Sequence, residues 1–223
     1  FFKQKTAYEM LRSLVGSEMC IRDRVMSDAG AVLIPHSLTE ARLYVKTQRC
    51  ASCGEGPLVI SREAPSYDAA AHRLTVAVVC DECGQAARIA FCVREIERRG
   101  PVLSMLGELR DVSRQPAAQV INPTRRPSRM IDVAGWVMLY TMLTEEARTE
   151  SLKSTSMQKR AAVRRMRIEA AQCLDEALKF FNEDSDLPPR EAFFTKESYR
   201  HFLDRPDLYT RQRLIEMRSQ SPR

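Results

Sequence analysis

The chain has 223 residues, a hydrophobic content of 44% and a formal net charge of +6, values that fit one or two small globular domains. No run approaches the roughly 20 apolar residues of a membrane-spanning helix, and polar residues interrupt the N-terminal apolar stretch, so we expect neither a signal peptide nor a membrane partner, and a cytoplasmic protein. The mildly basic balance permits a nucleic-acid partner without requiring one.

Two segments within residues 1–24 resemble translated sequencing-library adapters. Residues 3–9 (KQKTAYE) resemble the translation of a common adapter, and residues 14–23 (LVGSEMCIRD) resemble that of a transposon-type adapter. A barcode of about eight bases between the two segments keeps one reading frame. This agreement favours a non-native segment over the alternative, an amphipathic helix from Thr6 to Val15, and such segments are left out of fold reasoning.

Excluding residues 1–24 changes the functional account in two ways. Cys20 is removed from the candidate ligands, and the loss of five basic and three acidic residues lowers the net charge from +6 to +4. Met26 is then a candidate start of the native protein. Residues 25–41 are expected to form a flexible lead.

Two tight cysteine pairs predict a metal site. Two residues separate Cys50 from Cys53 and Cys80 from Cys83, and 26 residues lie between the pairs. Cysteines at this spacing can bind one ion from a single turn, and four thiolates are a common ligand set for structural zinc. A glycine follows each pair, as a turn with a positive φ favours. Four thiolates leave no open position for a water molecule, so we expect bound Zn²⁺ to be structural.

The residues around these pairs predict short β-strands. Residues 74–79 and 88–93 alternate between larger apolar and smaller or polar side chains, and residues 58–60 are apolar. Residues 64–72 contain the proline, serine and aspartate typical of a turn. Residues 43–47 could add a fourth strand.

The cysteines, the two glycines and the strand pattern together resemble the zinc-ribbon fold group over residues 42–98. The resemblance implies a small antiparallel sheet stabilised by the metal. The alternative is two redox-active pairs of the thioredoxin type, which normally occur in a βαβ context. Cys92 could be a spare ligand, but on this strand it is more consistent with a small apolar residue.

The remainder of the chain is predicted to be a linker followed by helices. Residues 99–128 are rich in proline and form the linker, with a short helix beginning at Pro101. Residues 129–219 form a helical domain, and residues 220–223 are a tail. The expected helices are residues 130–144 with Ser128 as N-cap, residues 157–181 after a turn at 149–156, residues 196–203 with Thr195 as N-cap, and a final helix from Pro206. Cys173 falls in the apolar stripe of the long helix and is expected to be a core thiol.

The predicted fold class is therefore α+β, a four-cysteine zinc ribbon of antiparallel strands followed by a C-terminal helical domain. Six arginines are candidate nucleic-acid contacts because arginine clusters neutralise phosphates: Arg125, Arg126, Arg129, Arg160, Arg164 and Arg167. The alternative, which the sequence slightly favours, is a solvated helix face balanced by the acidic second half of the same helix. Because one half of this helix is basic and the other acidic, a second copy of the protein could also bind to it in the antiparallel direction.

Three functions remain open from the sequence. The leading hypothesis is a zinc-binding interaction module that contacts nucleic acid or a ribonucleoprotein through the arginine-rich helix. The alternative is a protein–protein adaptor that uses the strand edge of the ribbon or an apolar surface around Trp136. The third is an enzyme with an unrecognised site; we expect no catalysis, because His36, His72 and His201 are scattered and form no constellation by spacing.

Overall fold

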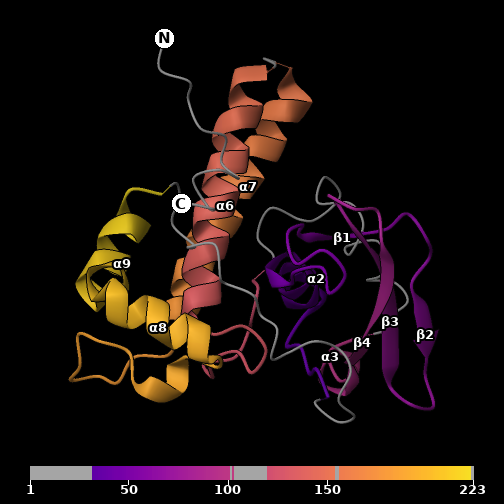
Figure 1. The fold of residues 1–223 in the computed structure, drawn as a ribbon, viewed down its shortest axis with the longest axis horizontal. Coiled ribbons are helices and arrows are strands. Elements are labelled where there is room, and N and C mark those ends of the chain that lie inside the picture. Colours follow the sequence, from indigo (N-terminus) through magenta and orange to yellow (C-terminus); the bar gives the residue numbers. More distant parts are fainter. Residues whose placement is uncertain (1–31, 101, 103–119, 154–155, 222–223) are drawn as a thin grey trace.

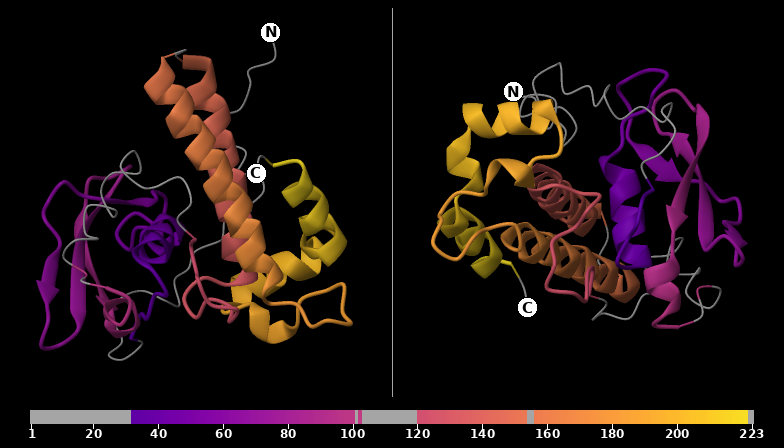
Figure 2. Two further views of the ribbon diagram at one scale, coloured as in Figure 1. Left: turned by 180° about the vertical axis from the view of Figure 1, so that it is seen from behind. Right: turned by 90° about the horizontal axis from the view of Figure 1, so that it is seen from below.

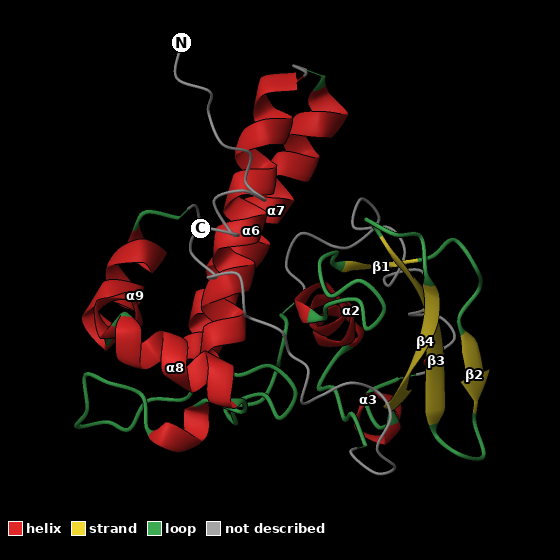
Figure 3. Ribbon diagram, viewed as in Figure 1, coloured by secondary structure: helices red, strands yellow, loops and turns green. Residues whose placement is uncertain are grey.

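The computed structural model describes residues 32–100, 102, 120–153 and 156–221. The adapter-like segments and most of the expected linker, including nearly all of its short helix, lie outside these residues. The described chain combines an antiparallel sheet of four strands in its N-terminal part with helices in its C-terminal part (Figure 3). The α+β fold class is therefore confirmed. We refer below to residues 32–100 as the sheet half and to residues 120–221 as the helical half.

The sheet is built around its third strand. The strands are β1 (Leu58–Ile60), β2 (Ser66–Asp68), β3 (Arg73–Cys80) and β4 (Ala86–Cys92). β1 and β2 pair with opposite ends of β3 along one edge, and β4 pairs along the other edge. The expected alternation on β3 is confirmed, because Leu74, Val76 and Val78 are buried while the residues between them are partly exposed. β2 lies where the sequence predicts only a turn.

The first described helix, α2 (Leu38–Thr47), replaces the predicted fourth strand and part of the predicted flexible lead. Its N-cap is Ser37, whose hydroxyl accepts a hydrogen bond from the Glu40 backbone at 3.0 Å. Before the helix, Leu33 forms a bridge with Phe91 of β4, so the described part of the lead is packed. α2 lies between the sheet and the helical half (Figure 1). Nearly all of its residues are buried, so it lacks the polar face that identifies most surface helices.

The helical half is organised around a hairpin of two long antiparallel helices, α6 (Val133–Lys153) and α7 (Met157–Leu178). The predicted turn at 149–156 is shorter, because α6 continues to Lys153. α8 (Lys196–Asp204) and α9 (Arg211–Ser219) lie against the lower part of the hairpin on the side away from the sheet (Figure 2). The other end of the hairpin extends beyond the rest of the described chain. Short helices complete the fold: α3 (Arg94–Glu97), η3 (Arg190–Ala192) and η4 (Pro206–Tyr209).

The apolar core is continuous between the two halves. Trp136 of α6 is fully buried in it, with Leu139 and Leu143 one and two turns further along. Trp136 therefore offers no exposed surface, which removes one of the two surfaces that the adaptor hypothesis names and leaves the strand edge of the ribbon. Cys173 of α7 is also fully buried, and burial raises its pKa well above the usual thiol value. It is a core thiol, as expected.

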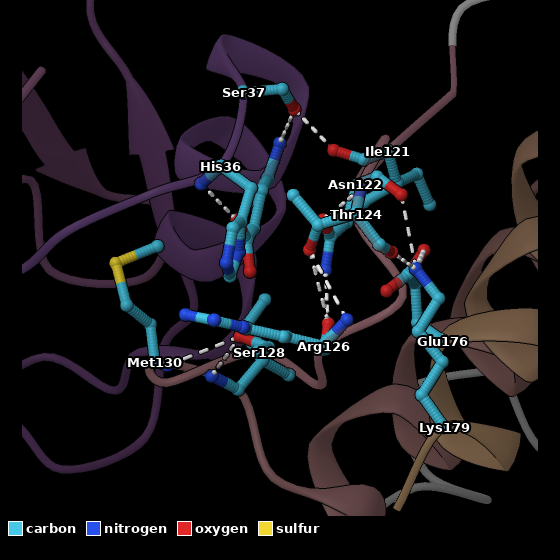
Figure 4. A network of polar contacts seen from close by, with 12 residues as sticks. His36, Ser37, Ile121, Asn122, Thr124, Arg126, Ser128, Met130, Glu176 and Lys179 are labelled. Carbon is cyan, nitrogen blue, oxygen red and sulfur yellow. Dashed lines mark hydrogen bonds and ion pairs between the residues drawn. The ribbon is translucent and has the colours of Figure 1, made fainter. Parts of the chain in front are cut away.

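Polar contacts also connect the halves (Figure 4). A buried ion pair joins Arg42 of α2 to Glu169 of α7. The Ser37 hydroxyl of the sheet half donates a hydrogen bond to the Ile121 carbonyl of the helical half. Within the helical half, the Lys179 ammonium holds this same segment by donating hydrogen bonds to the carbonyls of Asn122 and Thr124 at 3.0 and 2.9 Å. It also pairs with Glu176 at 2.7 Å, whose carboxyl pKa is raised mainly by burial. The sheet half and the helical half are consequently joined by buried charges as well as by apolar packing.

Candidate metal centre

The four predicted cysteines come together in space. The Sγ atoms of Cys50, Cys53, Cys80 and Cys83 all lie within 4.8 Å of one another. Two of the distances, Cys50 to Cys83 and Cys53 to Cys80, are 3.6 Å. Thiolates 2.3 Å from a central ion at the corners of a tetrahedron are about 3.8 Å apart. The cluster therefore has the size and the donor set of a tetrahedral four-thiolate site, and it is the one such group of possible metal ligands within the described residues.

Each cysteine pair is held by the same kind of turn. Gly54 and Gly84 have φ values of +71° and +72°, as predicted from their position after each pair. Their backbone amides donate to the carbonyls of Cys50 and Cys80 at 2.8 and 3.0 Å, which closes each turn. A side chain is strained in this conformation, whereas glycine adopts it readily. The two turns thus present their cysteines in equivalent ways, one pair before β1 and the other beginning at the last residue of β3.

Hydrogen bonds and mutual proximity shift the thiol pKa values in opposite directions. Backbone hydrogen bonds, first from Cys53 and then from Ser52, lower the pKa of Cys50 to about 6 against the effect of burial. At Cys83 a backbone hydrogen bond from Gln85 acts in the same direction, but contacts with the neighbouring thiols and desolvation outweigh it and raise the pKa to about 12. Negative charges this close oppose one another's formation. A cation bound among the sulfur atoms would favour the thiolate form.

Gly56 belongs to the site although the sequence analysis did not identify it. A Cβ atom at this position would lie 2.5 Å from the Cys80 sulfur and 2.8 Å from Cγ of Glu82. Its carbonyl accepts a hydrogen bond from the Cys50 amide at 3.0 Å. Gly56 therefore allows the first turn to approach the second closely. The only sequence signal is the Gly56-Pro57 dipeptide, which marks a turn but not what packs against it.

The surrounding residues add no further ligand. Cys92 is half-buried on β4 and lies outside the cluster, as expected for a small apolar residue. Asp81 and Glu82 are exposed. Four thiolates fill a tetrahedral shell, and such a site stabilises the fold without activating water.

The six candidate arginines are all exposed but do not form one surface. Arg160, Arg164 and Arg167 lie on one face of α7. Arg125, Arg126 and Arg129 lie in the loop before α6, which Lys179 binds at the far end of α7. Lys179 is 12 positions after Arg167 and 19 positions after Arg160, so at 1.5 Å per residue the helix group lies roughly 18 to 28 Å along α7 from the loop group. The structure therefore separates the helix group from the loop group.

The three histidines are also apart from one another. His36 pairs with Glu40 within the buried network, and His72 pairs with Glu97, which in turn accepts a hydrogen bond from Tyr67 at 2.5 Å. The ring of His201 contacts the Tyr209 hydroxyl at 2.7 Å. Each histidine thus contacts a different partner, and no histidine belongs to the four-cysteine cluster.

Comparison with known proteins adds no assignment. No family model, no curated protein and no solved structure matches the chain. None of the helices in the described part of the chain is long and apolar enough to cross a membrane. The geometry of the cluster and the distribution of charge are therefore the basis for a functional proposal.

Proposed function

We propose that the protein is a zinc-binding interaction module, in which Zn²⁺ stabilises the sheet half and the arginines of α7 contact nucleic acid. The observation that supports a metal is the group of four sulfur atoms within 4.8 Å of one another. Zinc is the ion that most commonly occupies a closed four-cysteine site. The site is an arrangement of zinc-ribbon type, with two glycine-terminated turns at one end of a small sheet.

The zinc proposal is tested by Cys83→Ser with Cys92→Ser as a matched control. Structural zinc contributes on the order of 10 kcal/mol to the folding of small metal-dependent domains. Cys83→Ser should therefore reduce bound zinc, measured by elemental analysis, and remove the native circular dichroism of the sheet half. Cys92→Ser lies outside the cluster and should keep one zinc ion per chain. Full zinc content in Cys83→Ser would contradict the assignment.

The nucleic-acid proposal is supported by one observation on α7. Arg160, Arg164 and Arg167 are exposed, and none of them makes an ion pair or side-chain hydrogen bond with any other residue that the structure describes. The acidic second half of α7 has other contacts, since Asp175 pairs with Arg218 and Glu176 with Lys179. These acidic residues therefore do not neutralise the three arginines by direct contact, as the interpretation of an inert, balanced helix face would suggest. Such unpaired guanidinium groups are suited to phosphates.

The test is binding of a labelled nucleic-acid duplex to the zinc-loaded full chain across a salt series. Replacing Arg160, Arg164 and Arg167 together with glutamine should weaken binding and flatten the dependence of log affinity on log salt, by a slope of about 0.9 for each phosphate that is no longer neutralised. The same replacement of Arg125, Arg126 and Arg129 removes equal charge at a distance and should have a smaller effect. Equal effects of the two triple variants would argue against a defined site on α7.

The adaptor alternative is less well supported. Trp136 is buried, and the seven-residue edge strand β4 is met at Phe91 by a bridge with Leu33. On the opposite edge of the sheet, β1 and β2 have only three residues each. Natural proteins shorten edge strands in this way to prevent pairing with other chains. Absence of nucleic-acid binding at low salt would nevertheless favour the adaptor hypothesis.

A further inference from the structure

The backbone of the sheet holds the two cysteine turns against each other. Leu58, at the start of β1, pairs with Cys80, the last residue of β3. Beside this pair, the Asp81 amide donates a hydrogen bond to the Pro57 carbonyl at 3.2 Å. A Cβ atom at Gly56 would lie 2.5 Å from the Cys80 sulfur, so the first turn packs directly against this sulfur. The pairing of β1 with β3 therefore determines which sulfur atoms face each other across the turns.

Each accessible cysteine of the cluster lies next to a buried cysteine of the opposite turn. Cys53 and Cys83 are exposed, whereas Cys50 and Cys80 are buried. The two sulfur atoms are 3.6 Å apart in the pair Cys83 and Cys50, and also in the pair Cys53 and Cys80. A disulfide has a sulfur–sulfur distance of about 2.05 Å, so the atoms of each pair need to approach by only about 1.6 Å. In both pairs an accessible sulfur can be oxidised and a buried sulfur lies within reach to react with it.

We propose that the cysteine cluster is a peroxide-sensitive site, in which oxidation forms two disulfides between the turns, Cys50 with Cys83 and Cys53 with Cys80. This inference rests on the metal-binding part of the proposed function and adds a reaction to it. In each pair the exposed thiolate attacks hydrogen peroxide, the O–O bond breaks, and a sulfenic acid and a hydroxide ion form. The buried thiolate then attacks the sulfenic sulfur, the S–S bond forms and a second hydroxide ion leaves. Two peroxide molecules accept the four electrons that the four cysteines lose, which leaves no thiolate to hold an ion.

Disulfides between the turns would replace the ion as the connection that holds the turns together. Each of them joins the segment before β1 to the end of β3, the same two points that a bound ion connects. Disulfides within the turns, from Cys50 to Cys53 and from Cys80 to Cys83, would leave the turns unconnected. An unfolded chain favours these, because closing a short loop costs less entropy than joining cysteines 33 or 27 positions apart. The pairing therefore shows whether the sheet is folded while the cysteines are oxidised.

The test treats the zinc-loaded full chain with hydrogen peroxide and follows the release of zinc with a chromophoric chelator. Cleavage by trypsin at arginines then places the two turns on separate peptides, residues 50–62 and 74–88. We expect the loss of one zinc ion per chain and the recovery of these two peptides joined to each other, and mass spectrometry of their fragments assigns the pairing. The native circular dichroism of the sheet half should be retained. Reduction with dithiothreitol in the presence of zinc should restore one zinc ion per chain.

Two controls and the remaining outcomes separate this inference from the proposed function. Cys92→Ser should give the same joined peptides, because Cys92 lies outside the cluster, and the chain oxidised in urea without zinc should give disulfides within each turn. Disulfides within the turns of the folded protein, sulfinic acids without a disulfide, or full retention of zinc would each overturn the inference. The zinc assignment would still be upheld by one zinc ion per chain in the reduced protein. Joined peptides from a protein that binds no zinc when reduced would contradict the zinc assignment and uphold the disulfide pairing.

Discussion

At the level of single residues, Gly56 determines how closely the two cysteine turns approach each other. The positive-φ glycines, Gly54 and Gly84, close each turn internally, and their role follows from the sequence because it depends only on neighbouring residues. The role of Gly56 depends on Cys80, which is 24 positions further along the chain and comes near only when the sheet folds. Local patterns therefore predicted the four cysteines that cluster and the turns that hold them, but not the residue that allows the turns to pack.

We expect Gly56→Ala to weaken metal binding by about 10- to 100-fold, the range found when residues supporting a metal ligand are changed. The added Cβ would lie 2.5 Å from the Cys80 sulfur, so a ligand or its turn must move. Gly54→Ala is an informative comparison, because a Cβ there meets no atom within 4 Å and only the backbone conformation is strained. Competition with a chromophoric chelator measures both affinities. A smaller loss in Gly56→Ala than in Gly54→Ala would contradict the packing argument.

At the level of elements, the start of α6 depends on Asp132 and not on the predicted cap, Ser128. The Asp132 carboxylate accepts a hydrogen bond from the Gly135 amide at 2.8 Å with one oxygen and from the Phe194 amide at 3.0 Å with the other. The Ser128 hydroxyl instead accepts from the amides of Met130 and Ile131 in the preceding turn. One buried carboxylate thus caps a helix and fixes the segment that leads into α8.

Asp132→Ala should lower the free energy of unfolding by roughly 2–4 kcal/mol, because two hydrogen bonds to a charged group are removed in a buried position. Asp132→Asn retains an acceptor oxygen for one of the two amides and should recover part of this stability. Urea denaturation followed by circular dichroism measures the difference. Asp204→Ala, at an exposed position in the last turn of α8, is a control that should change little.

The elements that the sequence predicted well are those with one buried and one exposed face. β3 and α7 show their period because polar residues alternate with apolar ones. α2 is enclosed by the sheet and the helical half, so its charged residues, including Glu40 and Arg42, are buried together with its apolar ones. Charged residues are normally expected at the surface, and a pattern analysis of α2 therefore favoured a flexible lead and a strand.

At the level of the whole molecule, the buried Arg42–Glu169 ion pair connects the two halves. The two side chains are only 6% and 9% exposed. Removing one member of a buried pair leaves the other charge uncompensated, at a cost of about 3–5 kcal/mol. The association of α2 with α7 should therefore be weakened by substitution of either residue alone.

We expect Arg42→Met to destabilise the protein by about 3–5 kcal/mol and to split thermal unfolding into separate transitions of the two halves. The double variant Arg42→Met with Glu169→Leu removes both charges and should recover much of the stability. Differential scanning calorimetry on zinc-loaded protein distinguishes one transition from two. A double variant as unstable as Arg42→Met would show that the contact contributes more than charge compensation.

α2 ends at Thr47, three residues before the first cysteine of the cluster, and the same helix carries Arg42 to α7. A free-energy coupling between two sites acts equally in both directions. Removal of the ion should therefore loosen the helical half, and a disruption of the helical half should raise the metal concentration needed for half-saturation. Under the proposed function, a chelator that removes zinc from the cysteine cluster would therefore also weaken the binding of nucleic acid to α7.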